Sequence, residues 1–158
     1  DAWEQSARPV SRQGVRLCLV RTGIVLGRDG GMLGKLLPVY RLGFGAMLGD
    51  GSQWLSWIHI DDMVAILVRA VETPGIDGVF NATAPAPVTQ REFHRSLANA
   101  VKRPAFLRVP SVALRAGLGE QSEILLGGQR VYPRRLEQQG FVFRFPDLTS
   151  ALAHQVKR

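Results

Sequence analysis

The residues of this sequence best suited to chemistry are His59, Asp61 and Asp62, which lie within four positions of one another. An imidazole beside carboxylates can move protons, bind a metal or hold a turn in shape. The metal interpretation lacks a third ligand nearby, so we predict no metal site. Proton transfer by His59 stays open, but a strand-to-helix turn held by the His and Asp side chains is favoured, and no catalytic residue is assigned. The other histidines, His94 and His154, fall on expected helices and are predicted to lie at the surface.

Two further groups are suited to binding. Trp54 and Trp57 offer large apolar faces on which a sugar or an aromatic ligand can stack, although core packing is the alternative, above all for Trp57. Arg21-Thr22-Gly23 ends an apolar strand, and open α/β sheets place ligands at the carboxyl ends of their strands. A glycine there permits close approach because it has no side chain. The alternative for this segment is an ordinary strand-to-loop turn.

The elements that would position these residues alternate between strand and helix, which indicates an α/β fold. The run Val15 to Val20 is almost continuously apolar and predicts a central parallel strand covered on both faces. Thr89 and Glu92 form a capping box that opens a helix, and Asp147 is expected to cap a last one. Further strands are expected at 54–60, 79–83, 106–109 and 141–145, and further helices at 1–8 (with Trp3 buried), 32–40 (broken near Pro38), 61–72 (capped by Asp61 or Asp62), 110–118, 121–126 and 133–139.

Composition narrows the class of protein. The 158 residues are 46% apolar and 21% charged, typical of a globular protein. The net charge of +7 could indicate nucleic acid, an anionic substrate or a phosphorylated cofactor. The basic residues are spread over several elements without a nucleic-acid-binding motif, so we predict no nucleic-acid partner. We expect no membrane partner, since no apolar run is long enough to span a bilayer. The lone Cys18 cannot form an internal disulfide, which favours a cytoplasmic location.

Six segments in order resemble one known family, the extended short-chain dehydrogenases/reductases. The closest resemblance is to the epimerase-like subgroup, often labelled as nucleoside-diphosphate-sugar epimerases or cell-division-inhibitor relatives, which has a small carboxyl-terminal domain of unknown function. The segments that carry it are Arg21 to Leu26, Gly30 to Pro38, Trp57 to Asp62, Asn81 to Pro85, Gly127 to Pro133 and Gly140 to Phe143.

The resemblance implies a partial, Rossmann-like parallel sheet that holds only the last strands, followed by a smaller α/β substrate-capping domain. We expect the first part to span residues 1–86 and the second 87–158. Members of the family bind NAD or NADP at a Gly-rich strand-to-helix turn and use a Tyr and a Lys for proton transfer. Neither motif occurs here. The glycine-rich run Gly27 to Gly31 follows a strand but has the wrong spacing, and Tyr40 and Tyr132 have no Lys four positions later. The chain is therefore expected to be the carboxyl-terminal, substrate-side portion of such an enzyme, without cofactor binding or activity on its own.

The resemblance also assigns binding residues. Arg21, Thr22 and Gly23 would lie beside the nicotinamide ring, and the segment with Gln53, Trp54, Trp57 and His59 would border the substrate. Nucleotide-sugar epimerases carry Gly-Asp-Gly-x-Gln-x-Arg-Asp, whose Arg binds the substrate diphosphate. The aligned residue here is Leu55, which can form neither an ion pair nor a bidentate hydrogen bond.

The predicted partner is a small-molecule substrate, with a sugar-like molecule as one candidate. The Leu55 replacement leaves open an alternative, a non-catalytic binding or regulatory protein on the same scaffold. If the flanking strands are missing, Val15 to Val20 would leave an edge unpaired, and the chain is expected to self-associate through that edge.

Overall fold

The computed structural model describes residues 2–119, 123 and 127–157, and the expected helix over 121–126 falls outside these residues apart from Glu123. Short parallel strands form the centre of the fold. β1 (Cys18–Thr22) pairs in parallel with β6 (Gly78–Ala82), and β2 (Ile24–Leu26) pairs in parallel with β5 (Trp57–His59). The predicted α/β class with a partial parallel sheet is confirmed.

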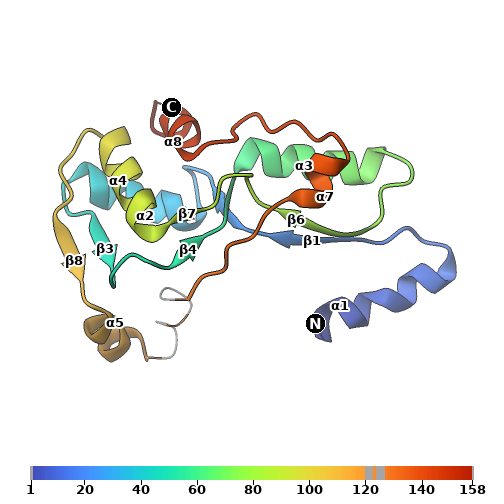
Figure 1. Cartoon of the computed structure of the whole chain (residues 1–158), viewed down its shortest axis with the longest axis horizontal. Coiled ribbons are helices and arrows are strands. Elements are labelled where there is room, and N and C mark those ends of the chain that lie inside the picture. Colours follow the sequence, from blue (N-terminus) through green and yellow to red (C-terminus); the bar gives the residue numbers. More distant parts are fainter. Residues whose placement is uncertain (1, 120–122, 124–126, 158) are drawn as a thin grey trace.

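Two further strand pairs lie toward the other end of the molecule. β3 (Ala46–Leu48) pairs in parallel with β8 (Leu107–Val109), and β4 (Trp54–Leu55) pairs antiparallel with β7 (Val88–Thr89). Figure 1 shows β3 and β8 side by side at the left, and β1 and β6 together at the centre and right. β4 runs between these two regions, so its residues are well placed to join them.

Helices surround these strands (Figure 1). α3 (Ile60–Glu72) follows β5 directly, and α8 (Leu148–Lys157) packs against α4 (Gln90–Ala100) and β2. None of the helices in the described part of the chain is long and apolar enough to cross a membrane. The remaining helices are α1 (Ala2–Ala7), the 3-10 helix η1 (Arg8–Gln13), α2 (Gly31–Arg41), α5 (Ser111–Leu118) and α7 (Arg134–Gln138).

Apolar side chains from distant parts of the sequence form two cores. The larger one joins Leu26 and Trp57 to Phe93 of α4 and Leu152 of α8. The smaller one centres on Ile58, Phe80 and Leu136. Because the larger core takes residues from both sides of position 86, the two predicted domains share buried surface, and the division at 86/87 stays a prediction.

Two of the three predicted helix caps are confirmed. Thr89 and Glu92 form the complete capping box of α4, and the Asp147 carboxylate accepts a hydrogen bond from the Ser150 backbone N–H (2.9 Å) at the start of α8. The cap of α3, however, is His59 rather than Asp61 or Asp62, since its side chain accepts from the Asp61 N–H.

Three further local predictions are wrong. Trp3 is 91% exposed rather than buried. α2 continues through Pro38 to Arg41. Residues 141–145 form no strand, because the backbone N–H groups of Arg144 and Phe145 bond to a side chain instead of a neighbouring strand.

The predicted central strand over Val15 to Val20, covered on both faces, differs from the structure. β1 begins at Cys18, none of its residues is fully buried, and Val15 is 52% exposed. In the described ranges, β1 pairs with β6 on one edge and with no strand on the other. Self-association through that edge stays a prediction.

Candidate functional site

A cavity of about 610 Å³ lies at the carboxyl ends of β1 and β6, where β4 and α4 approach them. This volume is in the usual range for small-molecule sites. Of the residues predicted to bind cofactor or substrate, Arg21, Thr22, Gly23, Gln53 and Trp54 all line this cavity. The rest of the described wall comes from α2, α4, the strands and a segment after α5: Ile24, Met32, Leu36, Tyr40, Ala46, Leu48, Leu55, Ser56, Asn81, Thr83, Gln90, Phe93, Gly127, Gly128, Gln129 and Val131.

The structure gives Gly23 a packing role that the sequence did not reveal. Its N–H donates to the Ala82 carbonyl oxygen (3.0 Å), which extends the β1–β6 pairing. A Cβ at this position would lie 2.7 Å from the Ser56 carbonyl oxygen and 2.9 Å from Thr83 Cγ2. Glycine is therefore required at position 23 because Ser56 and Thr83 of this chain lie close to it, and this requirement does not depend on a ligand.

Arg21 is already engaged within the chain. Its guanidinium donates two hydrogen bonds to the Glu4 carboxylate, at 2.6 and 2.8 Å. These bonds lower the pKa of Glu4 below its usual value. The positive charge of Arg21 at the cavity edge is thus matched by a carboxylate from α1.

Residues 127–132, here named the strap, line part of the cavity and are held by the side chains of Ser56 and Asn81. The Ser56 hydroxyl donates to the Gln129 carbonyl oxygen (2.7 Å) and accepts from the Val131 N–H (2.9 Å). The Asn81 amide donates to the Tyr132 carbonyl oxygen (3.2 Å). Asn81 therefore helps to hold the strap beside the cavity.

The two predicted tryptophans have different surroundings. Trp54 lines the cavity, and the Arg130 guanidinium lies over its ring at 4.3 Å, a cation–π arrangement. Trp57 is fully buried in the larger core, and its indole N–H donates to the Ala86 carbonyl oxygen (3.0 Å). Trp57 is not among the residues that line the cavity, so its geometry matches the core-packing alternative.

Sequence reasoning missed a buried pair formed by Tyr40, which lines the cavity, and His94 behind it. The Tyr40 hydroxyl lies 2.7 Å from His94 Nδ1, and His94 Nε2 lies 3.1 Å from the Ala105 carbonyl oxygen. His94 is thus buried, contrary to the surface prediction. Burial raises the pKa of Tyr40 to about 12, so its hydroxyl stays protonated at neutral pH. A tyrosine and a histidine far apart in sequence gave no signal of this contact.

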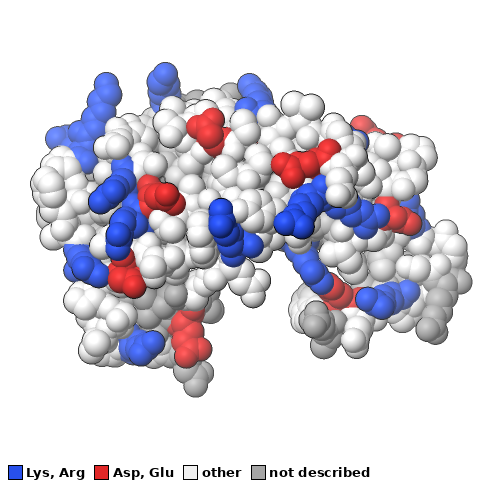
Figure 2. All heavy atoms as spheres, viewed as in Figure 1, with Lys and Arg blue, Asp and Glu red and all other residues white. Residues whose placement is uncertain are grey.

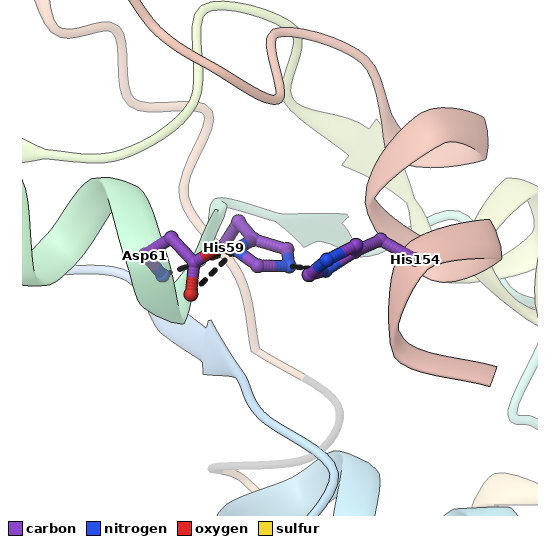
Figure 3. A group of neighbouring side chains, drawn as sticks. All are labelled: His59, Asp61 and His154. Atoms are coloured by element: carbon purple, nitrogen blue, oxygen red, sulfur yellow. Dashed lines mark hydrogen bonds and ion pairs between the residues drawn. The ribbon is translucent and has the colours of Figure 1, made fainter. Parts of the chain in front are cut away.

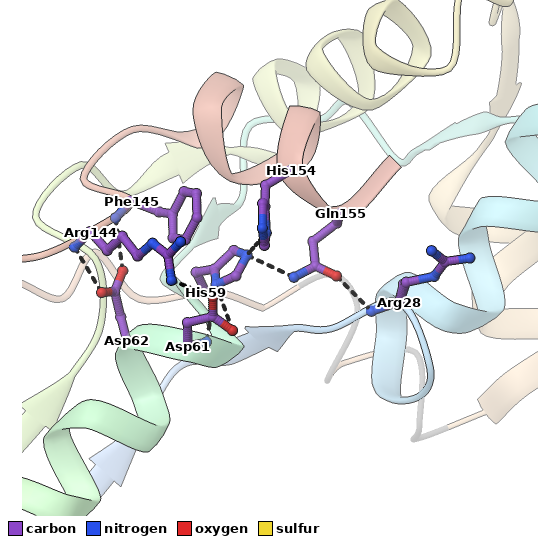
Figure 4. A network of polar contacts seen from close by, with 8 residues as sticks. All are labelled: Arg28, His59, Asp61, Asp62, Arg144, Phe145, His154 and Gln155. Carbon is purple, nitrogen blue, oxygen red and sulfur yellow. Dashed lines mark hydrogen bonds and ion pairs between the residues drawn. The ribbon is translucent and has the colours of Figure 1, made fainter. Parts of the chain in front are cut away.

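His59 lies outside the cavity wall, in a network between α3 and α8 (Figure 4). Its Nδ1 accepts from the Asp61 N–H (3.0 Å), and its Nε2 faces His154 Nδ1 (3.1 Å) and the Gln155 amide nitrogen (2.7 Å). The Phe145 ring stacks on the imidazole at 3.8 Å. His59 is therefore a buried helix cap that ties α3 to α8, as the turn-holding interpretation expects, and His154 is half-buried beside it.

The same network contains the one arrangement in the described residues that resembles a metal site, His59, Asp61 and His154, whose ligand atoms lie within 4.8 Å of one another. Figure 3 shows the His59 ring between the Asp61 carboxylate and His154. Nδ1, on the Asp61 side, already accepts a backbone hydrogen bond. A zinc ion needs ligand atoms that converge at about 2.0–2.3 Å, and this arrangement places two of them on opposite sides of a ring.

Stability should depend on pH through His59. Burial lowers the pKa of His59 below its usual 6.5; the charges of His154 and Arg144 act in the same direction, and those of Asp61 and Asp62 oppose it. The unfolded chain then takes up the proton first as the pH falls. We expect the free energy of unfolding to be constant above about pH 6.5 and to decrease below it, as measured by urea unfolding between pH 8 and 5.5.

His59→Asn supplies the control, because an asparagine oxygen can also cap a helix. This variant should show a flatter pH profile than the wild type, whereas His154→Gln should retain most of the slope. An unchanged slope in His59→Asn would contradict the assignment.

Asp62, expected as a possible cap of α3, instead makes a long-range contact. It is 2% exposed, and its carboxylate accepts from the backbone N–H groups of Arg144 (2.8 Å) and Phe145 (3.0 Å). Asp61, in contrast, forms a more exposed ion pair with the Arg144 side chain at 3.3 Å. Asp62 thus fixes the segment that leads into α8.

Surface charge gathers in no single region of the face seen in Figure 2. Lys and Arg side chains extend along its whole length, with Asp and Glu beside several of them. This face is hollowed along one edge, between the part that carries α5 and the part that carries α1 (Figures 1 and 2). The absence of a nucleic-acid partner stays a prediction.

Two protein-family models match parts of this chain. Residues 2–82 match the model of the NAD dependent epimerase/dehydratase family, and residues 109–155 match a domain of unknown function, DUF1731. An epimerase family protein of Mycobacterium bovis is 45% identical over 157 residues, which are 99% of this chain and 52% of the relative. Epimerase family protein SDR39U1 of Mus musculus is 44% identical over 151 residues, 95% of this chain and 51% of the relative. The chain spans about half the length of the curated relatives it matches.

Solved structures agree with these matches. Human epimerase family protein SDR39U1 (isoform 2), solved with NADPH, superposes with a TM-score of 0.88 and 40% identity, over 91% of this chain and 49% of that one. A UDP-glucose 4-epimerase of Thermus thermophilus, solved with NAD, shares the fold at a TM-score of 0.73 and 15% identity, over 99% of this chain and 50% of that one. The resemblance seen in the six sequence segments is confirmed: the chain belongs to the NAD dependent epimerase/dehydratase family.

Proposed function

We propose that this chain forms the substrate-side portion of an NAD(P)-dependent epimerase or oxidoreductase, with its substrate in the cavity beside the strap. The reaction class is reversible hydride transfer at a carbinol carbon. The observation that carries the proposal is the convergence of Arg21-Thr22-Gly23 and Gln53-Trp54 on one cavity at the carboxyl ends of parallel strands.

A bound nicotinamide would supply the hydride acceptor and donor. Within this chain, Thr22 is exposed at the cavity edge and is the side chain best placed to face the ring. The Gly23 N–H is already bonded to β6, so Gly23 would shape the site by packing. The strap and Trp54 would cover the substrate and exclude water.

The alternative is a non-catalytic binding or regulatory protein on the same scaffold. Its support is Leu55, which lines the cavity at the position where nucleotide-sugar epimerases carry a diphosphate-binding Arg. Turnover of any nicotinamide-dependent substrate would decide against this alternative.

The proposal predicts that the 158-residue chain alone shows negligible binding of NADPH or NADH. Its Gly-rich turn between β2 and α2, Gly27 to Gly31, lacks the Gly-x-Gly-x-x-Gly spacing of a dinucleotide site, and it has no Tyr-x-x-x-Lys pair. A nicotinamide fluorescence titration measures this. A chimera that places the amino-terminal half of human SDR39U1 before this chain should bind NADPH.

The amino-terminal half alone is the control for the chimera. Micromolar NADPH affinity of the 158-residue chain, or a folded chimera that binds no more NADPH than the chain alone, would contradict the proposal.

A further inference from the structure

A second cavity, of about 460 Å³, is lined by four arginines and, among its described walls, by no acidic residue. Arg21 belongs to β1, Arg130 belongs to the strap, and Arg134 and Arg135 belong to α7. We name this cavity the basic pocket. Basic side chains are spread over the molecule (Figure 2), but here four of them reach one small space.

Two of these four charges are balanced by carboxylates outside the pocket wall. The Arg21 guanidinium pairs with Glu4 at 2.6 Å, and the Arg135 guanidinium pairs with the exposed Asp77 at 3.3 Å. Arg135 also lies over the Phe80 ring at 4.5 Å. These two arginines are therefore held in place and largely neutralised.

The other two charges are not balanced in this way. Within the described ranges, no carboxylate lies within ion-pair distance of Arg130 or Arg134. Hydrogen bonds from Thr89, and to a smaller degree the charge of Arg130, lower the pKa of Glu92, but that carboxylate is already used in the capping box of α4. A phosphate monoester has a charge of about −1.5 to −2 at neutral pH, which matches two unbalanced guanidinium groups.

Arg130 is also fixed in position before any ligand binds. The Ser56 hydroxyl bonds the backbone on both sides of it. Its guanidinium lies over the Trp54 ring at 4.3 Å and over the Tyr132 ring at 5.3 Å. A guanidinium held by its backbone and by two rings loses less freedom when it binds an anion than a free one does.

The basic pocket adjoins the larger cavity of about 610 Å³. Arg21, Asn81 and Val131 line both, and Arg130 lies over the ring of Trp54, which lines the larger cavity. Apolar side chains from α2, α4 and β4 form much of the wall of the larger cavity, as is typical of sites for small organic molecules. One ligand can therefore place an apolar body in the larger cavity and an anionic group in the basic pocket.

We propose that the basic pocket binds the phosphate group of a phosphate monoester whose apolar body lies in the larger cavity, with Arg130 and Arg134 as the groups that neutralise the phosphate. The site is separate from position 55, because Leu55 lines the larger cavity and not the basic pocket. The role of this molecule as a substrate rests on the proposed function, whereas its binding requires no cofactor.

The test uses four probes on the 158-residue chain: benzyl phosphate, benzyl alcohol, inorganic phosphate and phenylacetate. Binding is followed by the NMR signal of the Trp54 indole N–H, with the Trp57 indole N–H, bonded to Ala86 in the core, as the internal reference. Benzyl phosphate should bind about tenfold more tightly than benzyl alcohol or inorganic phosphate, the effect of charge-assisted hydrogen bonds. Phenylacetate, with a single charge, should lie between benzyl phosphate and benzyl alcohol.

Arg130→Gln should remove the preference for benzyl phosphate and leave the affinity for benzyl alcohol unchanged. Arg95→Gln is the matched control, because it removes the same charge from an exposed position of α4 that lines neither cavity, and it should retain the preference. If Arg130→Gln melts well below the wild type, Arg134→Gln serves instead, since Arg134 is exposed, and it should reduce the preference.

Four results would overturn the inference: equal binding of benzyl phosphate and benzyl alcohol, equal binding of benzyl phosphate and inorganic phosphate, an equal loss in Arg95→Gln and Arg130→Gln, or no Trp54 response to any probe. Probes of this size should bind in the millimolar range, which is separate from the micromolar range that the NADPH titration tests. Because no cofactor is present, failure here is distinguishable from failure of the NADPH experiment, which tests the proposed function.

Discussion

Asp62→Ala is expected to lower the free energy of unfolding by about 3 kcal/mol, because the Arg144 and Phe145 N–H groups lose a buried carboxylate acceptor. The cost arises mainly from donors left without a partner away from water. Urea unfolding followed by circular dichroism measures the loss as a lower midpoint at an unchanged slope.

Asp61→Ala is the matched control for this variant. It removes the same charge one residue earlier, but its contact with Arg144 is more exposed, and such pairs contribute at most about 1 kcal/mol. Asp62→Asn should give an intermediate loss, since the amide keeps one oxygen acceptor. Equal effects of Asp61→Ala and Asp62→Ala would show that Asp62 does not hold the segment before α8.

Gly23→Ala is expected to destabilise the chain by about 2 kcal/mol, the usual range for overpacking. The new methyl group would lie 2.7 Å from the Ser56 carbonyl oxygen and 2.9 Å from Thr83 Cγ2, so the start of β2 would have to move away from the residue before β5. Thermal unfolding would detect the change, and the Trp54 indole N–H signal should shift because Ser56 also fixes the strap.

Gly27→Ala is the control, because it adds the same methyl group at a position with room for it. At Gly27 the nearest atom to an added Cβ is Ile60 Cβ at 3.7 Å, an ordinary contact. This variant should stay within about 0.5 kcal/mol of the wild type. A Gly23→Ala protein as stable as Gly27→Ala would contradict the packing role of Gly23.

The sequence predicted structure correctly where the interactions that form it join residues close together in the chain. The capping box of Thr89 and Glu92 and the cap at Asp147 depend on residues three positions apart. The rule that open α/β sheets place ligands at strand carboxyl ends depends on strand direction alone, and it selected Arg21, Thr22 and Gly23, which line the cavity. The family resemblance, not a local signal, selected Gln53 and Trp54.

Contacts between distant segments could not be predicted in the same way. The alternating pattern of Phe141, Phe143 and Phe145 is typical of a strand, but the Asp62 carboxylate takes two N–H groups that strand pairing would use. His94 is polar and was expected at the surface, yet Tyr40, from another helix, gives it a buried partner. The basic pocket showed no signal, because its four arginines come from β1, the strap and α7, and only the fold brings them together.

The shared core also constrains the order in which the polypeptide can mature on the ribosome. Leu26 and Leu152 belong to the same buried cluster although they are far apart in the sequence. The amino-terminal strands emerge from the ribosome long before α8 exists, and until then their apolar side chains have no final partner. A nascent chain stalled before Leu148 should therefore expose this cluster to chaperones and proteases.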